Sequence, residues 1–197
     1  MPDDQGRFLA TGPRVGLRPF SPDDAEEFTA RARESRELHR PWLFPPCTPE
    51  AYAVYAGALT GDPARAGFLV CEHEGPGVAG HGDGGRIAGF VNINNIVRGA
   101  FRSGALGYGA FAHAAGRGLL GEALGLVMAY AFGPLELHRL EANIQPGNAA
   151  SRALVRRAGF RLEGFSPAML FVDGAWRDHE RWAITAPDGP AAPPQRL

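Results

Sequence analysis

The sequence predicts one mixed α/β domain, in which strand-like and helix-like segments alternate along most of the chain. Apolar residues make up 45% of the 197 residues and charged residues 21%, which is the balance of a globular protein with a packed core. Short apolar runs are separated by glycine and proline, as in strands and helices joined by turns. We therefore expect a single domain over residues 1–185.

The first third of the chain predicts a strand and then two capped helices. Residues 14–19 alternate apolar and polar side chains, as a half-buried strand does. Residues 21–24 (Ser-Pro-Asp-Asp) combine an N-cap, a first-turn proline and two acids, which marks a helix start. That helix extends to about Glu37, and a stiff loop at residues 41–46 follows it. Residues 48–50 (Thr-Pro-Glu) begin the second helix.

Two strands in the middle of the chain, residues 67–72 and 86–96, flank a glycine-rich segment. Residues 75–85 contain six glycines in eleven positions. Such a chain is costly to order, so we expect a mobile hairpin loop and no binding site. A phosphate-binding loop would precede a helix, whereas this segment precedes a strand.

The second half predicts four more strands, two helices and a tail. Asn148 caps the shorter helix and Gly159 ends it, while Asp173-Gly174 is typical of a tight hairpin turn. The tail, residues 186–197, is rich in Pro and Ala and is expected to be disordered. The expected strands are residues 105–112, 139–144, 166–172 and 176–185, and the expected helices are residues 119–132 and 148–158.

The charged residues and cysteines exclude several kinds of chemistry. All twenty basic residues are Arg, so there is no lysine for a Schiff base or for a phosphate-loop motif. The net charge of -1 gives no overall basic field for nucleic acid or an anionic membrane. Cys47 and Cys71 cannot form a disulfide scaffold, which favours a reducing cytoplasm, and the histidines lack metal-ligand spacing. The oligomeric state stays open between monomer and homodimer.

A glycine-rich turn at Gly116-x-Gly118-x-x-Gly121 is the sharpest local motif. It follows an expected strand and opens an expected helix, where backbone N–H groups and the helix dipole can bind an anion. The spacing also matches a dinucleotide fingerprint, with Glu141 twenty residues further on. A nicotinamide-dependent oxidoreductase is therefore one alternative, although few residues remain for a second nucleotide-binding half. A turn with a purely structural role is another.

A second motif, Pro146-x-Asn148-x-x-Ser151, lies at the end of an expected strand. Asn148 is most simply an N-cap, yet strand ends of open α/β sheets are where ligands bind. Arginines that could meet phosphates are nearby, although a solvated face is the simpler reading of them. These are Arg117, Arg152, Arg156 and Arg157.

Further segments fit one protein family when they are taken together in order. They are Leu38-His39-Arg40-Pro41-Trp42, residues 95–101, Leu106-Gly107-Tyr108, Gly116-Arg117-Gly118-Leu119, Glu122-Ala123-Leu124, residues 138–143, Pro146-x-Asn148-x-x-Ser151, residues 158–164 and residues 173–179. The chain resembles the RimJ/RimL branch of the GNAT superfamily of acetyl-CoA-dependent N-acetyltransferases, and within it the RimJ-type ribosomal-protein alanine N-acetyltransferases. The resemblance implies a twisted mixed sheet of about seven strands with helices on both faces. It also implies that two central strands splay apart.

The resemblance also implies where acetyl-CoA would bind. The pantetheine arm would lie along the free edge of the strand near Ala110, Phe111 and Ala112, as an added strand does. Asn148 would hold that arm, and Ser151 would lie near the thioester sulfur and protonate the leaving thiolate. The diphosphate would bind the turn and helix start formed by Ala115, Gly116, Arg117, Gly118, Leu119 and Leu120. The acceptor would meet Trp42, Asn92 and Tyr108.

The chain departs from the family pattern at the general base. Leu170 and Ala105 stand where relatives have carboxylates, and Ala115 replaces a polar residue of the glycine turn. An α-amine with a pKa near 7.7 to 8.0 is already roughly 10 to 20% neutral at pH 7, against about 0.04% for lysine. The missing base therefore favours an α-amine, with water and Glu141 relaying the proton. The expected oxyanion donor is a backbone N–H near Ala110 or Phe111.

The expected activity is acetyl transfer from acetyl-CoA to an N-terminal α-amine, Ala or Ser of a ribosomal protein, by direct attack without a metal. A small-molecule amine as acceptor and a non-catalytic acyl-CoA-binding module are the remaining alternatives. Asn148→Ala and Ser151→Ala are expected to lower turnover at nearly unchanged melting temperature.

Overall fold

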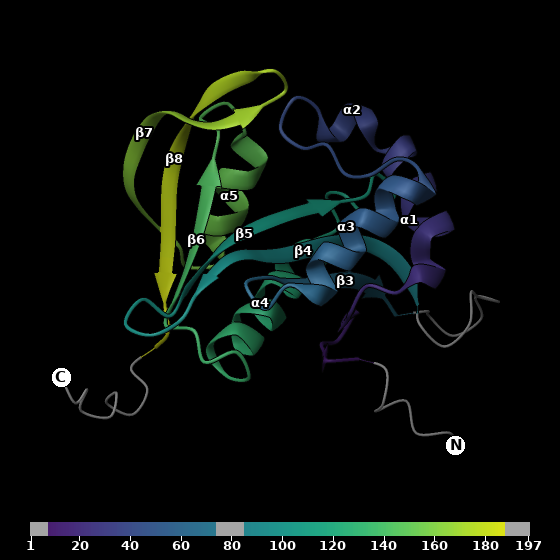
Figure 1. Ribbon diagram of the computed structural model, residues 1–197, viewed down its shortest axis with the longest axis horizontal. Coiled ribbons are helices and arrows are strands. Elements are labelled where there is room, and N and C mark those ends of the chain that lie inside the picture. The colour runs from purple at the N-terminus through teal and green to yellow at the C-terminus, as the bar shows by residue number, and fades with distance from the viewer. Residues whose placement is uncertain (1–7, 74–84, 188–197) are drawn as a thin grey trace.

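The fold is seen in a computed structural model that describes residues 8–73 and 85–187 (Figure 1). The described residues form one eight-stranded sheet with the order β1-β2-β3-β4-β5-β6-β8-β7. Every neighbouring pair is antiparallel except β5 and β6. The strands are β1 (Ala10–Thr11), β2 (Val15–Arg18), β3 (Ala66–Glu72), β4 (Arg86–Val97), β5 (Ser103–Ala110), β6 (Arg139–Ile144), β7 (Arg161–Val172) and β8 (Ala175–Thr185).

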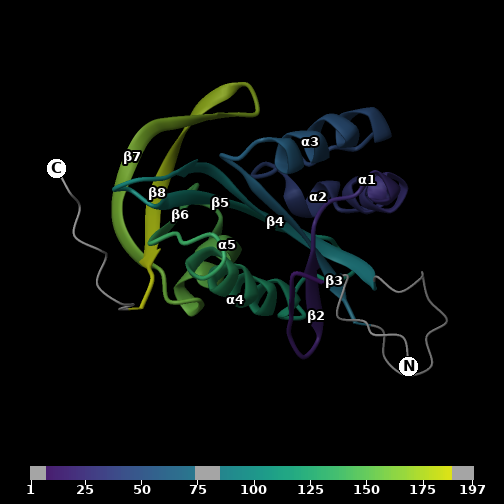
Figure 2. The ribbon, with the colours of Figure 1, turned by 60° about the horizontal axis from the view of Figure 1, so that its bottom comes forward.

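Helices cover both faces of the sheet, as Figure 2 shows. One face carries α1 (Ala25–Glu34), α2 (Arg36–His39) and α3 (Pro49–Gly61), and the other carries α4 (Leu119–Phe132) and α5 (Ala149–Arg157). Alternate residues of β3 serve the two cores: Phe68 and Val70 pack on the α4 side, while Leu69 and Cys71 pack with the aromatic cluster beneath α1 and α3. Two separate apolar cores therefore hold the sheet between its helices.

The two central strands pair only at one end. β5 and β6 are in parallel register from Ser103–Arg139 to Leu106–Ala142. Beyond this point the two strands continue without pairing with each other. In Figure 1 they diverge beyond this point. The expected splay of a GNAT fold is thus present, and it opens a slot in the middle of the sheet.

The local signals read from the sequence are present at the helix starts and at one turn. Ser21 and Asp24 form a capping box at the short 3-10 turn Pro22–Asp24 that leads into α1. The Thr48 side chain accepts a hydrogen bond from the Ala51 N–H at the start of α3. Asp173 and Gly174, both with positive φ, make the turn between β7 and β8.

The structure differs from the expectations in four respects. It has eight strands rather than about seven, because the two-residue β1 adds to the edge of β2. β7 begins at Arg161, five residues before the expected start, because β8 is long enough to pair with it there. The first helix is divided: α1 ends at Glu34, and α2 is a separate short helix. The strand expected at residues 105–112 starts at Ser103 and ends at Ala110, where the chain bends away.

Two further expectations fall outside the described residues. These are the glycine-rich loop, described only at Gly85, and the tail beyond residue 187. No described helix has the length and hydropathy needed to span a membrane.

Candidate active site

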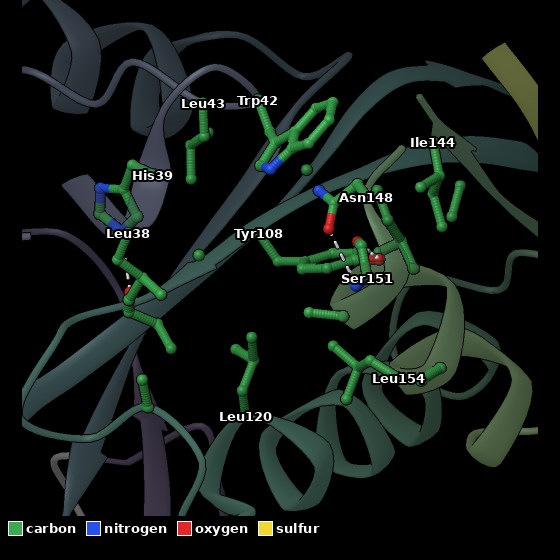
Figure 3. Close-up of a pocket in the computed structure, with 18 of the residues that line it drawn as sticks. Leu38, His39, Trp42, Leu43, Tyr108, Leu120, Ile144, Asn148, Ser151 and Leu154 are labelled. Atoms are coloured by element: carbon green, nitrogen blue, oxygen red, sulfur yellow. Dashed lines mark hydrogen bonds between the residues drawn. The ribbon is translucent and has the colours of Figure 1, made fainter. Parts of the chain in front are cut away.

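A cavity of about 560 Å³ occupies the slot between β5 and β6 and reaches both faces of the sheet. On one side it is lined by the turn before α4 and by Leu120 and Leu154, and on the other by Leu38, Trp42 and Leu43. Figure 3 shows Tyr108 and Ser151 between these two sets of side chains. A long substrate entering from the α4 side could therefore meet a second substrate arriving from the α2 side.

The glycine turn before α4 presents its backbone N–H groups without partners. Gly116 and Gly118 have φ of 74° and 79°, a left-handed conformation that glycine adopts without strain. The N–H groups of residues 116–120 donate to no acceptor in the described part of the chain. Arg14, which precedes β2, donates to the Arg117 carbonyl at 3.0 Å and forms an ion pair with Glu122 at 2.8 Å. The turn is thereby fixed with a set of donors suited to an anion.

The edge of β5 offers fewer amides than the sequence suggested. Phe111 N–H donates to Ala88 at 2.9 Å, and Ala112 N–H donates to Ser35 Oγ at 2.8 Å. Because hydrogen bonding alternates along a strand, the Phe111 bond implies that the Tyr108 and Ala110 N–H groups point away from β4, into the slot. Phe111 and Ala112 therefore cannot supply free donors, and Ala110 N–H remains the donor at the strand end.

The bend at the end of β5 is held by two residues that the sequence did not single out. His39 Nε2 donates to the Ala110 carbonyl at 2.8 Å, and Ser35 accepts the Ala112 N–H. Burial lowers the pKa of His39, which favours the neutral ring. The α1–α2 segment thus fixes where the free edge of β5 ends.

Tyr108, Asn148 and Ser151 meet inside the cavity. The Tyr108 hydroxyl lies 2.6 Å from Ser151 Oγ, and Asn148 Oδ1 accepts the Ser151 N–H at 3.0 Å. Burial raises the pKa of Tyr108 to about 12, so its hydroxyl stays protonated at neutral pH. Asn148 is the N-cap of α5. Its truncation is therefore expected to lower stability, so we now predict a lower melting temperature for Asn148→Ala in place of a nearly unchanged one.

The arginines near the two motifs divide into paired and unpaired groups. Arg117 pairs with Glu72 on β3, and Arg152 pairs with Glu180 at 2.9 Å. Arg157 lines the cavity and has no ion-pair partner among the described residues. Arg157 is thus the arginine best placed to meet an anionic ligand there.

The family model for the acetyltransferase (GNAT) domain matches residues 14–161 of the chain. The chain belongs to the GNAT acetyltransferase family. It is an acetyl-CoA-dependent N-acetyltransferase, and acetyl-CoA is its co-substrate. Among residues 8–73 and 85–187, no group of three or more His, Cys, Asp or Glu side chains could hold a metal ion.

Relatives of this GNAT enzyme include ribosomal-protein acetyltransferases. The ribosomal protein uS5-alanine N-acetyltransferase of Escherichia coli (strain K12) is 33% identical over 182 residues, which cover 90% of this chain and 91% of that one. Mycobacterium smegmatis RimJ in complex with CoA-disulfide has a TM-score of 0.77 at 30% identity, covering 87% and 82% of the two chains. The ribosomal-protein-S5-alanine acetyltransferase from Vibrio fischeri, at 24% identity and a TM-score of 0.74, shares the fold over 89% and 95%.

The family assignment and the topology exclude the oxidoreductase alternative. A dinucleotide-binding half needs several adjacent parallel strands, and β5–β6 is the one parallel pair in the described sheet. Glu141, which completed that fingerprint, is instead paired with Arg139 at 2.8 Å. The glycine spacing matched because both kinds of site use a tight turn at a helix N-terminus.

The residues expected to meet the acceptor are only partly brought together. Trp42 and Tyr108 line the cavity, and Trp42 also lies over Gly147, where an added Cβ would come within 2.8 Å of the indole. Asn92 is buried on β4, donates to the Tyr55 hydroxyl and does not line the cavity. Glu141 does not line it either. Asn143 and His179 do, although the sequence did not indicate them for this role.

Proposed function

We propose that this GNAT enzyme acetylates the N-terminal α-amine of a ribosomal protein, with Ala or Ser as the first residue. The observation that carries the proposal is the absence of any carboxylate from the side chains that line the cavity in the described structure. Lysine or polyamine acceptors are almost fully protonated at pH 7, and a carboxylate would be needed to bind their positive charge. An α-amine is already partly neutral at pH 7, so it depends less on such a carboxylate.

The acceptor side of the cavity supports a small first residue. Leu38, Trp42 and Leu43 form an apolar wall there, and the indole of Trp42 narrows it over Gly147. Alanine or serine side chains are short enough to fit beside this wall without burying a charge. The named function of the Escherichia coli relative points in the same direction. A ribosomal-protein acceptor would place the reaction in the cytoplasm.

The chain offers groups to bind acetyl-CoA and to stabilise charge during the reaction. The N–H groups of residues 116–120 and the Arg157 guanidinium are assigned to the diphosphate, because both are unpaired where the cavity opens on the α4 side. The slot-facing backbone of Tyr108 is assigned to the pantetheine arm. Ala110 N–H is the donor for the oxyanion that forms on the acetyl oxygen.

Ser151 is assigned as the group that protonates the leaving thiolate. The amine attacks the thioester carbon directly, the C–N bond forms, and the C–S bond breaks with its electron pair on sulfur. Ser151 Oγ gives that sulfur a proton, and the Tyr108 hydroxyl at 2.6 Å can return one to Ser151. The high pKa of Tyr108 keeps it in the protonated form that this step requires.

The test uses one peptide that carries both kinds of amine. A peptide beginning with Ala and containing an internal Lys is incubated at pH 7 with acetyl-CoA, and thiol release is followed together with the site of acetylation by mass spectrometry. We expect acetylation at the α-amine in preference to the lysine by on the order of hundreds-fold, which is the ratio of their neutral fractions. The same peptide with a blocked N-terminus should be inert. Equal rates for the blocked peptide or for spermidine would overturn the proposal.

A further inference from the structure

Two polar side chains on the acceptor side of the cavity have no part in the steps above. Asn143 on β6 and His179 on β8 both line the cavity. In the β6–β8 register, Asn143 is opposite Arg181, which is two residues from His179. Residues two apart on a strand share a face, so Asn143 and His179 form a diagonal pair on neighbouring strands.

The face from which this pair projects follows from the neighbouring residues. Ala142 and Ile144 on β6 are buried in the core on the α4 side. Side chains alternate along a strand, so Asn143 points to the opposite face, where α1, α2 and α3 lie. The pair therefore faces the end of the cavity that receives the acceptor.

The hydrogen bond of His179 fixes which ring nitrogen is free. Nδ1 lies 2.9 Å from the carbonyl oxygen of Arg177, and because that oxygen can only accept, Nδ1 carries the proton. In this tautomer Nε2 presents a lone pair, and it has no hydrogen-bond partner within residues 8–73 and 85–187. The residue is only 3% exposed and lines the cavity, so small molecules reach this base through the cavity.

Asn143 supplies a second acceptor in the same place. Its Oδ1 is buried and has no partner among the described residues. A buried amide oxygen without a hydrogen bond is costly, so such an atom in a binding cavity indicates a donor brought by the ligand. An amine with two N–H bonds is complementary to one imidazole nitrogen and one amide oxygen.

We propose that His179 is the general base of the acetyl transfer and that Asn143 orients the acceptor amine. This rests on the proposed direct attack of an amine in this cavity. As the C–N bond forms, the amine loses one proton to His179 Nε2, while its second N–H donates to Asn143 Oδ1. The C–S bond breaks and the thiolate takes its proton from Ser151. One proton thus leaves nitrogen and one reaches sulfur.

The main test compares His179→Asn with the wild-type enzyme. Asparagine keeps a donor toward the Arg177 carbonyl and loses the base. We expect kcat to fall about 100-fold with the KM for acetyl-CoA unchanged. In His179→Ala, added imidazole should restore part of the rate. His138→Asn, an exposed histidine outside the cavity, is the matched control and should leave kcat unchanged. A wild-type kcat in His179→Asn would overturn the proposal.

Asn143→Leu tests the orienting role separately. It keeps the size of the side chain and removes the acceptor, so the KM for the amine should rise while the KM for acetyl-CoA stays the same. An unchanged KM for the amine would remove Asn143 from the site.

A labelling experiment separates this proposal from the choice of acceptor. Diethyl pyrocarbonate acylates unprotonated imidazole nitrogens, and mass spectrometry follows each histidine without any turnover. His179 should be labelled, and more slowly when coenzyme A and an Ala-initiated peptide are bound. His39 should resist, because its Nε2 is hydrogen-bonded and its Nδ1 is buried. If His179 is labelled but the enzyme acetylates only amines other than α-amines, the proposed acceptor is refuted and the role of His179 as base is supported. If His179 is not labelled, its role as base is refuted.

Discussion

Gly116 and Gly174 form a natural pair for testing how coenzyme A is held. Both have a φ of 74°, and a Cβ added at either would meet no described atom within 4 Å. Alanine at either position therefore pays only the strain of a left-handed backbone, about 1 kcal/mol. Gly116 lies in the turn assigned to the diphosphate, whereas Gly174 lies in the β7–β8 turn, outside the cavity. The two substitutions should differ only in their effect on the ligand.

The expected sizes follow from that strain. Gly116→Ala and Gly174→Ala should each lower the melting temperature by about 2–4 °C for a chain of this length. At a hundredfold excess over Kd, coenzyme A should stabilise the wild-type enzyme by about 2.7 kcal/mol. If Gly116→Ala turns the amides away and weakens binding tenfold, about 1.4 kcal/mol of this is lost. The rise in Tm caused by coenzyme A should then be about half of that in Gly174→Ala.

The measurement is thermal unfolding with and without coenzyme A, with Kd from isothermal titration calorimetry. Equal ligand-induced rises in the two variants would refute the assignment of the diphosphate to this turn. A much larger loss of stability in Gly116→Ala without ligand would show that backbone strain is not the whole cost of the substitution.

Three further predictions concern binding, capping and pH. Arg157→Ala should raise the KM for acetyl-CoA about fivefold at low salt, because an exposed ion pair contributes roughly 1 kcal/mol. Arg156 lies outside the main cavity, so Arg156→Ala should leave this KM unchanged. Equal effects of the two substitutions in steady-state kinetics would contradict the assignment. Asn148→Ala should remove the cap of α5 and lower Tm by about 2–4 °C, from about 1 kcal/mol, and Asn148→Asp should restore Tm in a thermal scan. Burial and two nearby arginines lower the pKa of His113 from 6.5 to about 4, so its contribution to stability is present above pH 6.5 and is lost as the pH falls toward 4. The urea midpoint of His113→Gln should vary less over that range, and identical curves would refute this.

Much of the fold could be predicted from local sequence signals. The expected helix at residues 119–132 and strand at residues 139–144 have those bounds in the structure, because glycines flank the helix and apolar residues alternate along the strand. The Ser21 and Thr48 caps act within three residues of their partners, so short-range chemistry suffices to find them. The first helix is divided at Ser35, whose side chain accepts the N–H of the distant Ala112. β1 pairs with the neighbouring β2, but two residues are too short to show a strand pattern.

The site was predictable to the extent that its groups belong to motifs. The glycine turn and the Asn148–Ser151 spacing could be found because each forms a contiguous segment at a helix start. Asn92 was misplaced because the direction of a side chain depends on the strand register, which the sequence does not reveal. The same reason explains why Asn143 and His179 were missed. They are 36 positions apart in the chain and meet only through the β6–β8 pairing.

The amino-acid order alone was sufficient to recognise the GNAT family through its ordered motifs, and that resemblance implied the splayed pair of strands. The glycine turn before α4 could be found because it is a contiguous segment. Folding in three dimensions settled which backbone amides stay free and which side chains face the slot. The N–H groups of Phe111 and Ala112 donate to the Ala88 carbonyl and to Ser35 Oγ, and the Glu141 carboxylate accepts from Arg139. The physical reason is that a backbone N–H normally donates to one acceptor, and acceptors far apart in sequence are brought to it only when the sheet and helices pack.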